Sequence, residues 1–243
     1  MSHTHTSRTY FLIYRELFIK FGMNDDDVVS LREMWNESHR HYHSYTHLRN
    51  ILKLIEKDEL SYYDEIGESK PVSNRSPKYC QMWDLLKIIA FFHDAIYQTP
   101  ATISKMFMMK PETFMTLIAW NEIASAELAI KMCKNFTKEQ KKLVFDAIID
   151  TADHSKKPSS FISAIFLEYD LWNLTHGTLS TMIEDEKKIF KEFGFVDFSI
   201  YKEKRVKILA KFGDYIRKKN PETMFDAYLD WCKSNVPNIA IYP

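Results

Sequence analysis

The stretch Trp83–Phe92, WDLLKIIAFF, is apolar on nearly every side of a helix and stops directly before His93 and Asp94. Such a helix is buried among other helices, because it has no polar face to turn toward solvent. His93 and Asp94 are thereby carried into a low-dielectric interior, where an unpaired carboxylate is strongly unfavourable. The interior must therefore hold a partner for Asp94, and both side chains are of metal-ligand types.

The rest of the chain supports an all-α fold. Its 243 residues include only five glycines and many aromatic residues, and no strand-like alternation of any length occurs. We predict one domain over residues 1–243, because no internal repeat and no hinge divides the chain. Loop insertions are expected near 61–79 and near 98–118, where prolines interrupt sequence that lacks a clear helical period.

Hydrophobic periodicity, capping residues and a glycine stop predict the other helices. They are expected at Thr9–Phe21 (closed by Gly22), from Asn24–Asp27 through Trp35, around Leu48–Ile55, and at Ile118–Lys134, Lys138–His154, Phe161–Thr175, Thr181–Phe193, Ile200–Lys219 and Glu222–Lys233.

Charge and cysteine content exclude several classes of function. Thirty-three basic residues balance 33 acidic ones, so no global field recruits nucleic acid or an anionic membrane. The three cysteines are scattered and are interpreted as reduced thiols. No apolar stretch reaches the roughly 18 to 20 residues that span a bilayer, and the first eight residues resemble no signal peptide. We therefore predict a cytoplasmic protein with no membrane partner, and leave its oligomeric state open.

A histidine-rich stretch precedes the helix around Leu48–Ile55. The spacing His43-x3-His47 places both rings on one helical face if the helix begins early enough. Alternatively, Ser44 is the N-cap and His43 lies in the entering loop, with its ring near the same place. The neighbouring His39 and His41 are interpreted as solvated.

Three further residues could contribute to a polar site. Asp170 shares a helical face with Phe166, and a carboxylate among bulky apolar neighbours is either a metal ligand or a buried hydrogen-bonded group. His154 fits a helix-terminal histidine near the C-terminal dipole. Glu122 is either a surface glutamate or a base of the site.

In chain order, His47, His93-Asp94 and Asp170 resemble the HD superfamily of metal-dependent phosphohydrolases, whose four ligands follow an H…HD…D sequence. The match is closer to one branch of this superfamily, and it covers about residues 30–216, including Arg205 in an R-x3-L pattern. The motifs stand here as Arg40-x-Tyr42-His43-x3-His47, Phe92-His93-Asp94-x2-Tyr97, Asn121-Glu122-x2-Ser125-Ala126, Ile148-x2-Thr151-x2-His154 and Asp170-Leu171-x2-Leu174.

This resemblance implies an HD-type helical bundle with a metal site at its centre, in which His47, His93, Asp94 and Asp170 bind one or two divalent ions. Mixed imidazole and carboxylate ligands suit Mn²⁺, Fe²⁺, Zn²⁺ or, in part, Mg²⁺. The implied reaction is hydrolysis of a phosphate ester or anhydride of a small metabolite by metal-activated water, with a nucleotide as the leading candidate.

Cyclic-nucleotide phosphodiesterases, a distant branch of the superfamily, carry a similar His-x3-His arrangement, which implies roles for two histidines. His43 would protonate the leaving oxygen, and His47 would bind the metal. Arg40 would suit a phosphate through its guanidinium fork. Other motif residues would surround the ligands, the substrate or the attacking water: Glu122, a catalytic candidate, and Tyr97, Asn121, Ser125 and His154.

Two other classes of function stay open. Some HD-fold proteins hold two irons and activate O₂, which requires additional histidine ligands such as His154. The chain could also be a metal- or nucleotide-binding module without turnover.

The segment Gln98–Thr116 and the loop before Cys80 are longer than the matching branch of the HD superfamily usually carries. The first of these either forms a lid or partner surface, or fills the core with its methionines.

Overall fold

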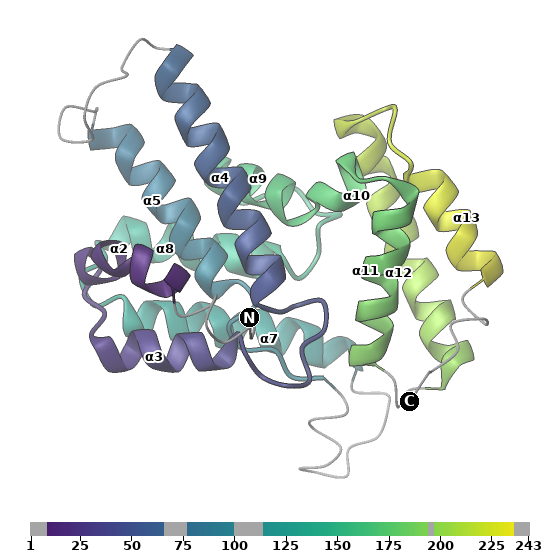
Figure 1. Cartoon of the computed structure of the whole chain (residues 1–243), viewed down its shortest axis with the longest axis horizontal. Coiled ribbons are helices and arrows are strands. Elements are labelled where there is room, and N and C mark those ends of the chain that lie inside the picture. Colours follow the sequence, from purple (N-terminus) through teal and green to yellow (C-terminus); the bar gives the residue numbers. More distant parts are fainter. Residues whose placement is uncertain (1–8, 66–76, 100–113, 194–196, 236–243) are drawn as a thin grey trace.

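The computed structural model describes residues 9–65, 77–99, 114–193 and 197–235, and every regular element within these ranges is a helix (Figure 1). The all-α prediction is therefore confirmed. In chain order the helices are α2 (Arg15–Lys20), α3 (Asp25–Met34), α4 (Tyr45–Glu65), α5 (Pro77–Phe92), α7 (Phe114–Met132), α8 (Lys138–Asp150), α9 (Phe161–Asp170), α10 (Trp172–His176), α11 (Leu179–Glu192), α12 (Phe198–Lys219) and α13 (Phe225–Asn235). Within the same ranges, no helix has both the length and the hydrophobicity needed to cross a bilayer.

The helices from α2 to α9 form a first group, and α5 lies at its centre. It packs against α4, α7, α8 and α9. In the last two turns of α5, every apolar residue is at most 2% exposed: Leu85, Leu86, Ile88, Ile89, Ala90, Phe91 and Phe92. The predicted burial of this run on all sides is confirmed. Burying a side chain of this size stabilises the fold by about 1.5–3 kcal/mol, so α5 supplies much of the apolar driving force.

Phe91 fixes the N-terminal segment to α5. Its ring makes edge contacts with Phe11, Tyr14 and Phe18, with centroid distances of 5.2, 5.1 and 4.7 Å. Contacts of this geometry add about 0.5–1.5 kcal/mol to the gain from burial. The Phe91 carbonyl also accepts a hydrogen bond from the Trp35 indole at 2.8 Å. The helix end that carries the candidate ligands is therefore held from several sides.

Gly22 ends the first helical segment as predicted. Its φ is 84°, in the left-handed region that favours glycine. The Gly22 N–H donates to the Ile19 carbonyl at 2.9 Å, and the Met23 N–H donates to the Phe18 carbonyl at 3.0 Å. These are the two hydrogen bonds of a Schellman motif, which satisfies the last carbonyls of a helix.

The loop predicted near 61–79 is wrong at both edges, because α4 continues to Glu65 and α5 begins at Pro77. Tyr63 is 1% exposed, and the Tyr62 ring lies 6.2 Å from the Trp83 ring. Packing of these two tyrosines stabilises the last turn of α4 despite its polar composition. Similarly, α7 begins inside the loop predicted at 98–118. Residues 66–76 and 100–113 lie outside the described residues, and with them most of the methionine-rich segment Gln98–Thr116, so neither interpretation of that segment is tested.

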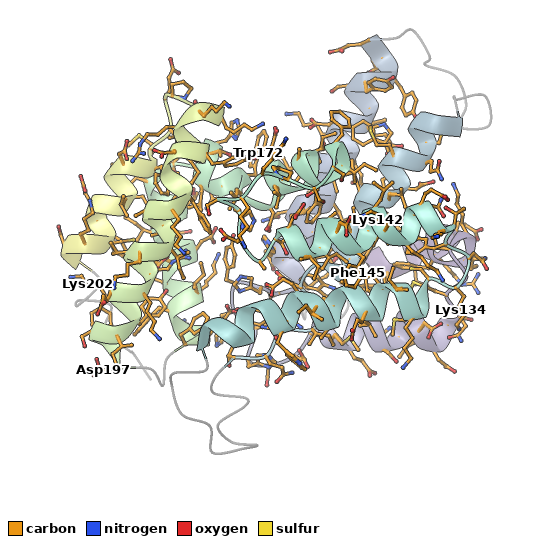
Figure 2. All side chains as sticks on the ribbon, turned by 180° about the vertical axis from the view of Figure 1, so that it is seen from behind. Lys134, Lys142, Phe145, Trp172, Asp197 and Lys202 are labelled. Atoms are coloured by element: carbon orange, nitrogen blue, oxygen red, sulfur yellow. The ribbon has the colours of Figure 1, made fainter. Side chains whose placement is uncertain are left out.

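The buried apolar side chains form two clusters in the described ranges. The first core joins the helices up to α9 and includes Trp35, Leu52, Phe91 and Phe166. The second core joins α11, α12 and α13 and includes Met182, Phe190, Leu209, Phe225 and Tyr228. Figure 1 shows α10–α13 beside the first group of helices, and Figure 2 shows α7 and α8 side by side on the opposite face. That these parts form one domain stays a prediction.

Candidate metal centre

His93 and Asp94 lie in the turn that directly follows α5. His93 is 2% exposed, and its Nδ1 is 2.9 Å from the carbonyl oxygen of Ala90. Because a carbonyl only accepts hydrogen bonds, Nδ1 carries the hydrogen. In the neutral ring, Nε2 therefore presents a lone pair to the interior.

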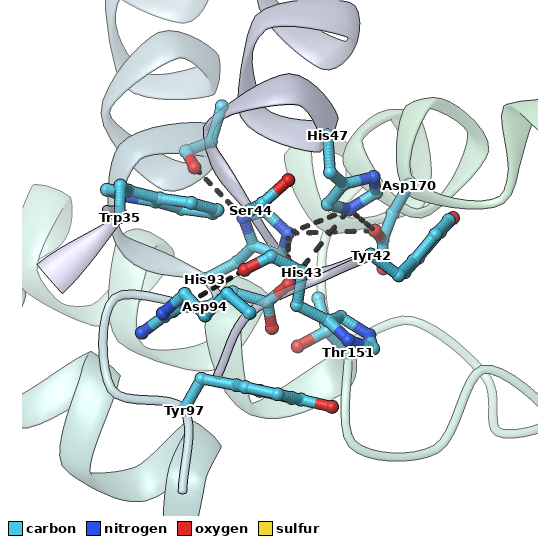
Figure 3. Close-up of polar contacts among 12 residues, drawn as sticks. Trp35, Tyr42, His43, Ser44, His47, His93, Asp94, Tyr97, Thr151 and Asp170 are labelled. Atoms are coloured by element: carbon cyan, nitrogen blue, oxygen red, sulfur yellow. Dashed lines mark hydrogen bonds and ion pairs between the residues drawn. The ribbon is translucent and has the colours of Figure 1, made fainter. Parts of the chain in front are cut away.

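His93 Nε2 faces three other candidate ligand atoms (Figure 3). It lies 3.1 Å from Asp94 Oδ2, 3.6 Å from Asp170 Oδ1 and 3.4 Å from His47 Nε2. His47 Nε2 is in turn 3.1 Å from Asp170 Oδ1. The ligand atoms of His47, His93 and Asp170 all lie within 4.8 Å of one another, and this group could hold a metal ion.

Asp94 stands at the edge of this three-residue group. Its Oδ2 contacts His93 and lies 4.0 Å from His47 Nε2, but Asp94 is not one of the three residues whose atoms all converge. The structure therefore brings together all four predicted ligands, three of them more tightly than the fourth. The side chains of Asp94 and Asp170 are both 13% exposed, so the group is buried but not sealed from solvent.

The two carboxylates and the histidines perturb one another strongly. Burial lowers the pKa of His93, but the charge of Asp94 and then that of Asp170 raise it to about 9. Burial acts to raise the pKa of both carboxyls, yet hydrogen bonds and charge from the histidines hold the two values below their usual range. The group therefore requires positive charge at its centre, as a proton or as a metal ion. This donor set fits a divalent metal.

His47 lies in the first turn of α4 and is 9% exposed. The Thr46 N–H points to Ser44 Oγ at 3.4 Å, so Ser44 stands at the start of the helix and His43 lies in the entering loop. The expectation that both histidines share a helical face is wrong. The alternative is confirmed, since the two ring centroids are 6.1 Å apart.

Asp170 is the last residue of α9. The predicted helix through Thr175 breaks at Leu171, whose φ and ψ are −90° and 11°. The predicted helix end at His154 is also wrong, because α8 ends at Asp150 and His154 lies in the turns beyond it. There His154 Nε2 is 2.8 Å from Asp170 Oδ2. His154 thereby holds one carboxylate oxygen and leaves the other directed at His47.

Glu192 is a central residue of the site that the sequence did not reveal. It ends α11 and is 3% exposed. Its Oε1 accepts hydrogen bonds from the backbone N–H groups of His41, Tyr42 and His43 at 2.7, 2.7 and 2.9 Å. Its Oε2 is 2.7 Å from His43 Nδ1 and accepts from the Tyr97 hydroxyl at 2.9 Å. The only signal in the sequence is an acidic residue that ends an amphipathic helix, which is too common to single out.

The contact with Glu192 defines which ring nitrogen of His43 carries a hydrogen. A carboxylate accepts, so His43 Nδ1 carries a hydrogen and Nε2 is left for the site. Burial lowers the pKa of His43, but the Glu192 charge outweighs it and the pKa is raised. The ring stacks on Tyr97 at a centroid distance of 4.4 Å, and the side chain is 24% exposed. His43 is thus an oriented, partly exposed imidazole whose pKa is raised by its carboxylate partner.

Arg40 does not fit the phosphate-binding role that the resemblance implied. It is 6% exposed and lies between the Trp35 and Tyr97 rings. Its Nε donates to Glu37, and its terminal nitrogens donate to the carbonyls of His43, Asp94 and Ala95 at 3.1, 2.7 and 2.8 Å. With these donors committed, Arg40 joins the loop of His43 to the turn after α5 rather than offering a fork to a ligand.

Asn121 and Ser125 also bind backbone. Asn121 exchanges two hydrogen bonds of 3.0 Å with the N–H and carbonyl of Gln98, and Ser125 Oγ accepts from the Ile96 N–H at 2.9 Å. Being four residues apart on α7, they clamp the chain that follows Asp94. The expectation that they surround the substrate is therefore replaced by a structural role. Tyr97, in the same clamped chain, contacts His43 and Glu192 rather than the convergent ligand atoms.

Glu122 lies beside the metal-ligand group. It is 9% exposed, and its Oε2 has no hydrogen-bond partner among the residues that the structure describes. Burial, and then the charge of Asp94, raise its pKa to about 8. The alternative of a surface glutamate is wrong. A buried carboxyl with a free oxygen is suited to bind and orient a water molecule.

The two outer histidines differ. His41 is exposed, as expected. His39 is only partly exposed, at 24% of its side chain, because its Nε2 donates to the Tyr97 carbonyl at 2.7 Å and its ring stacks on Tyr97.

No protein-family model, no curated protein and no solved structure matches this chain. The likeness to the HD superfamily therefore depends on its motifs alone.

Proposed function

We propose that the protein is a metal-dependent phosphohydrolase of the HD type. The observation that carries this proposal is the convergence of His47, His93 and Asp170 beside a second, separate device, the Glu192-oriented imidazole of His43. A purely structural histidine cluster has no need of a partly exposed imidazole that a buried carboxylate orients beside it. The combination is suited to cleaving a bond whose leaving group takes up a proton.

His47, His93, Asp94 and Asp170 would hold a divalent ion such as Mn²⁺, Fe²⁺, Zn²⁺ or Mg²⁺. Bound there, the ion would lower the pKa of a water molecule and offset negative charge on a phosphoryl group. His154 would keep Asp170 oriented through the 2.8 Å contact between Nε2 and Oδ2. Because that nitrogen is engaged with Asp170, His154 is less suited to bind a second iron, which disfavours the oxygenase alternative.

Two side chains would carry out the two proton transfers of the reaction. His43, protonated and oriented by Glu192, would donate its Nε2 proton to the leaving oxygen as the P–O bond breaks. Glu122, with its free Oε2 and raised pKa, would orient the attacking water and accept its proton. We propose a small phosphorylated metabolite as the substrate, with nucleotides as the first class to test.

Replacing His43 and His47 separately tests these roles. His47→Ala should lose metal and activity together. His43→Ala should retain metal and lose turnover by about 10²- to 10⁴-fold, the usual contribution of a general acid. This loss should shrink for p-nitrophenyl esters, whose leaving group scarcely needs a proton. Metal content by elemental analysis and rates over a series of leaving groups measure both effects.

His41→Ala is the matched control, because His41 is exposed in the same loop and only its backbone N–H contacts Glu192. Its metal content and turnover should equal those of the wild type. If His43→Ala slows all leaving groups equally, the general-acid role is wrong. If the metal-loaded wild type hydrolyses no nucleotide and no phosphate ester, the proposed function fails.

A further inference from the structure

Arg205 lies in the second core, paired with a fully buried carboxylate. Its Nε is 3.2 Å from Glu186 Oε1 and 2.9 Å from Oε2, and Glu186 is 0% exposed. The hydroxyls of Tyr201 and Tyr228 donate to the same carboxylate. The charge of Arg205 is therefore anchored at one edge of its guanidinium, on a rigid base.

The other edge of the guanidinium is uncommitted. Within the described ranges, the two terminal nitrogens of Arg205 donate no hydrogen bond, and the side chain is 16% exposed. A guanidinium has five N–H donors, of which this pair uses only the one on Nε. The contrast with Arg40 is direct, because the terminal nitrogens of Arg40 are taken by backbone carbonyls.

Helix α12 places Arg205 on the side of the metal-ligand group. Phe212 is seven residues after Arg205, which is two helical turns and the same face. The Phe212 ring lies 5.3 Å from the ring of His154, which in turn contacts Asp170. The face of α12 that carries Arg205 therefore contacts His154, a partner of Asp170, two turns further along the helix.

Tyr42 contacts both the second core and the two site histidines. Its ring lies 4.8 Å from the His43 ring and 4.9 Å from the His47 ring, and it packs against the second core. The second core, which holds the Arg205–Glu186 pair, therefore contacts both site histidines through Tyr42.

We propose that Arg205 is the anion anchor of this site, and that its free terminal nitrogens bind phosphoryl oxygens of the substrate while Glu186 fixes the guanidinium through Nε. This inference rests on the proposed function and names the group that recognises the substrate's phosphate. A planar fork donates two parallel hydrogen bonds to two phosphoryl oxygens, which an ammonium group cannot do. Anchoring one edge reduces the conformational freedom that binding would otherwise cost.

Arg205→Lys tests the anchor, because the lysine keeps the charge and can pair with Glu186 but lacks a second edge. Inorganic phosphate is titrated calorimetrically into the metal-loaded full chain. The variant should bind phosphate roughly 10- to 100-fold more weakly, the loss expected for charge-assisted hydrogen bonds. Metal affinity, measured by competition with a chelator, should equal that of the wild type. Arg217→Lys is the matched control on the same helix, since Arg217 pairs with Asp226 on the exposed side and should leave phosphate binding unchanged.

A double variant, Arg205→Gln with Glu186→Gln, guards against misfolding, because it removes both charges and leaves no unpaired one buried. It should lose phosphate affinity to at least the same extent. Phosphate binding as tight as wild type in either folded variant overturns the anchor, and so does a metal-loaded wild type that binds no phosphate. Arg205-dependent phosphate binding without hydrolysis of any ester would retain the anchor and reject the proposed function.

Discussion

Glu186 in the second core and Asp170 at the edge of the first are both largely buried carboxylates, but their partners differ. Glu186 accepts from the Tyr201 and Tyr228 hydroxyls and pairs with the Nε of Arg205. All of these donors keep their hydrogens at any physiological pH. Its negative charge is satisfied permanently by the protein itself.

The partners of Asp170 are imidazoles. Oδ1 faces His47 Nε2 and His93 Nε2, and Oδ2 faces His154 Nε2. An imidazole nitrogen supplies a hydrogen only when it is protonated there, so this carboxylate depends on protons or on a cation from solution. Burial of a carboxylate therefore does not by itself indicate function. The identity of its donors separates a structural acid from one that could bind a metal.

The largest effect is expected from breaking the permanent ion pair between Glu186 and Arg205. Glu186→Gln leaves the guanidinium of Arg205 without its counter-charge, and breaking a buried pair in this way costs about 3 kcal/mol or more. Urea unfolding should show this loss of stability, with the metal affinity of the folded fraction unchanged. A variant as stable as wild type would show that solvent compensates Arg205, which is 16% exposed.

The next largest effect is expected from replacing Asp170, the carboxylate whose charge depends on protons or on a cation. Asp170→Asn keeps the size and hydrogen bonding of the side chain but loses the charge. Metal affinity should fall by at least about 100-fold, since losing even a partner of a ligand costs about 10- to 100-fold. Chelator competition measures the affinity. Glu168→Gln, which removes a half-exposed carboxylate from the same helix, should retain it. Unchanged affinity in Asp170→Asn would assign Asp170 to the structural class of Glu186.

The smallest effect is a pH dependence of the metal affinity, which the histidine partners of Asp170 should cause. His93, with a pKa of about 9 in the metal-free state, must lose a proton to bind a metal. Metal affinity should therefore rise about tenfold per pH unit between pH 6 and 8, with release of about one proton. Calorimetry in buffers of different ionisation enthalpy counts that proton. A pH-independent affinity would contradict the assignment of His93 as a ligand.

The same raised pKa makes a prediction for the metal-free protein. A histidine whose pKa is higher in the folded state stabilises the fold below its unfolded pKa, near 6.5, and this contribution is lost as the pH rises toward 9. Thermal unfolding of the metal-free protein should therefore occur at lower temperature at pH 9 than at pH 6.5. Saturating metal should remove this difference, because the ion replaces the proton.

The sequence by itself determined the central helix and the identity of the ligand types. The apolar run Trp83–Phe92 can be stable only when it is surrounded, and His93 and Asp94 at its end then need a partner inside. Burial of the run and the stop at Gly22 follow from local patterns. Local patterns report which face of a helix is buried, and these features depend on little else. The convergence of His47 and Asp170 on His93 was expected only from the resemblance to the HD superfamily.

The tertiary structure alone decided which polar groups are committed and which are free. Glu192 reaches His43 across 149 residues of sequence, and Arg40 reaches the Asp94 carbonyl across 54. The resemblance to the HD superfamily therefore suggested a phosphate role for Arg40, whose donors are committed, whereas the terminal nitrogens of Arg205 donate no hydrogen bond within the described residues. A hydrogen bond depends on distances of about 3 Å between groups that chain folding brings together, and no local periodicity encodes them.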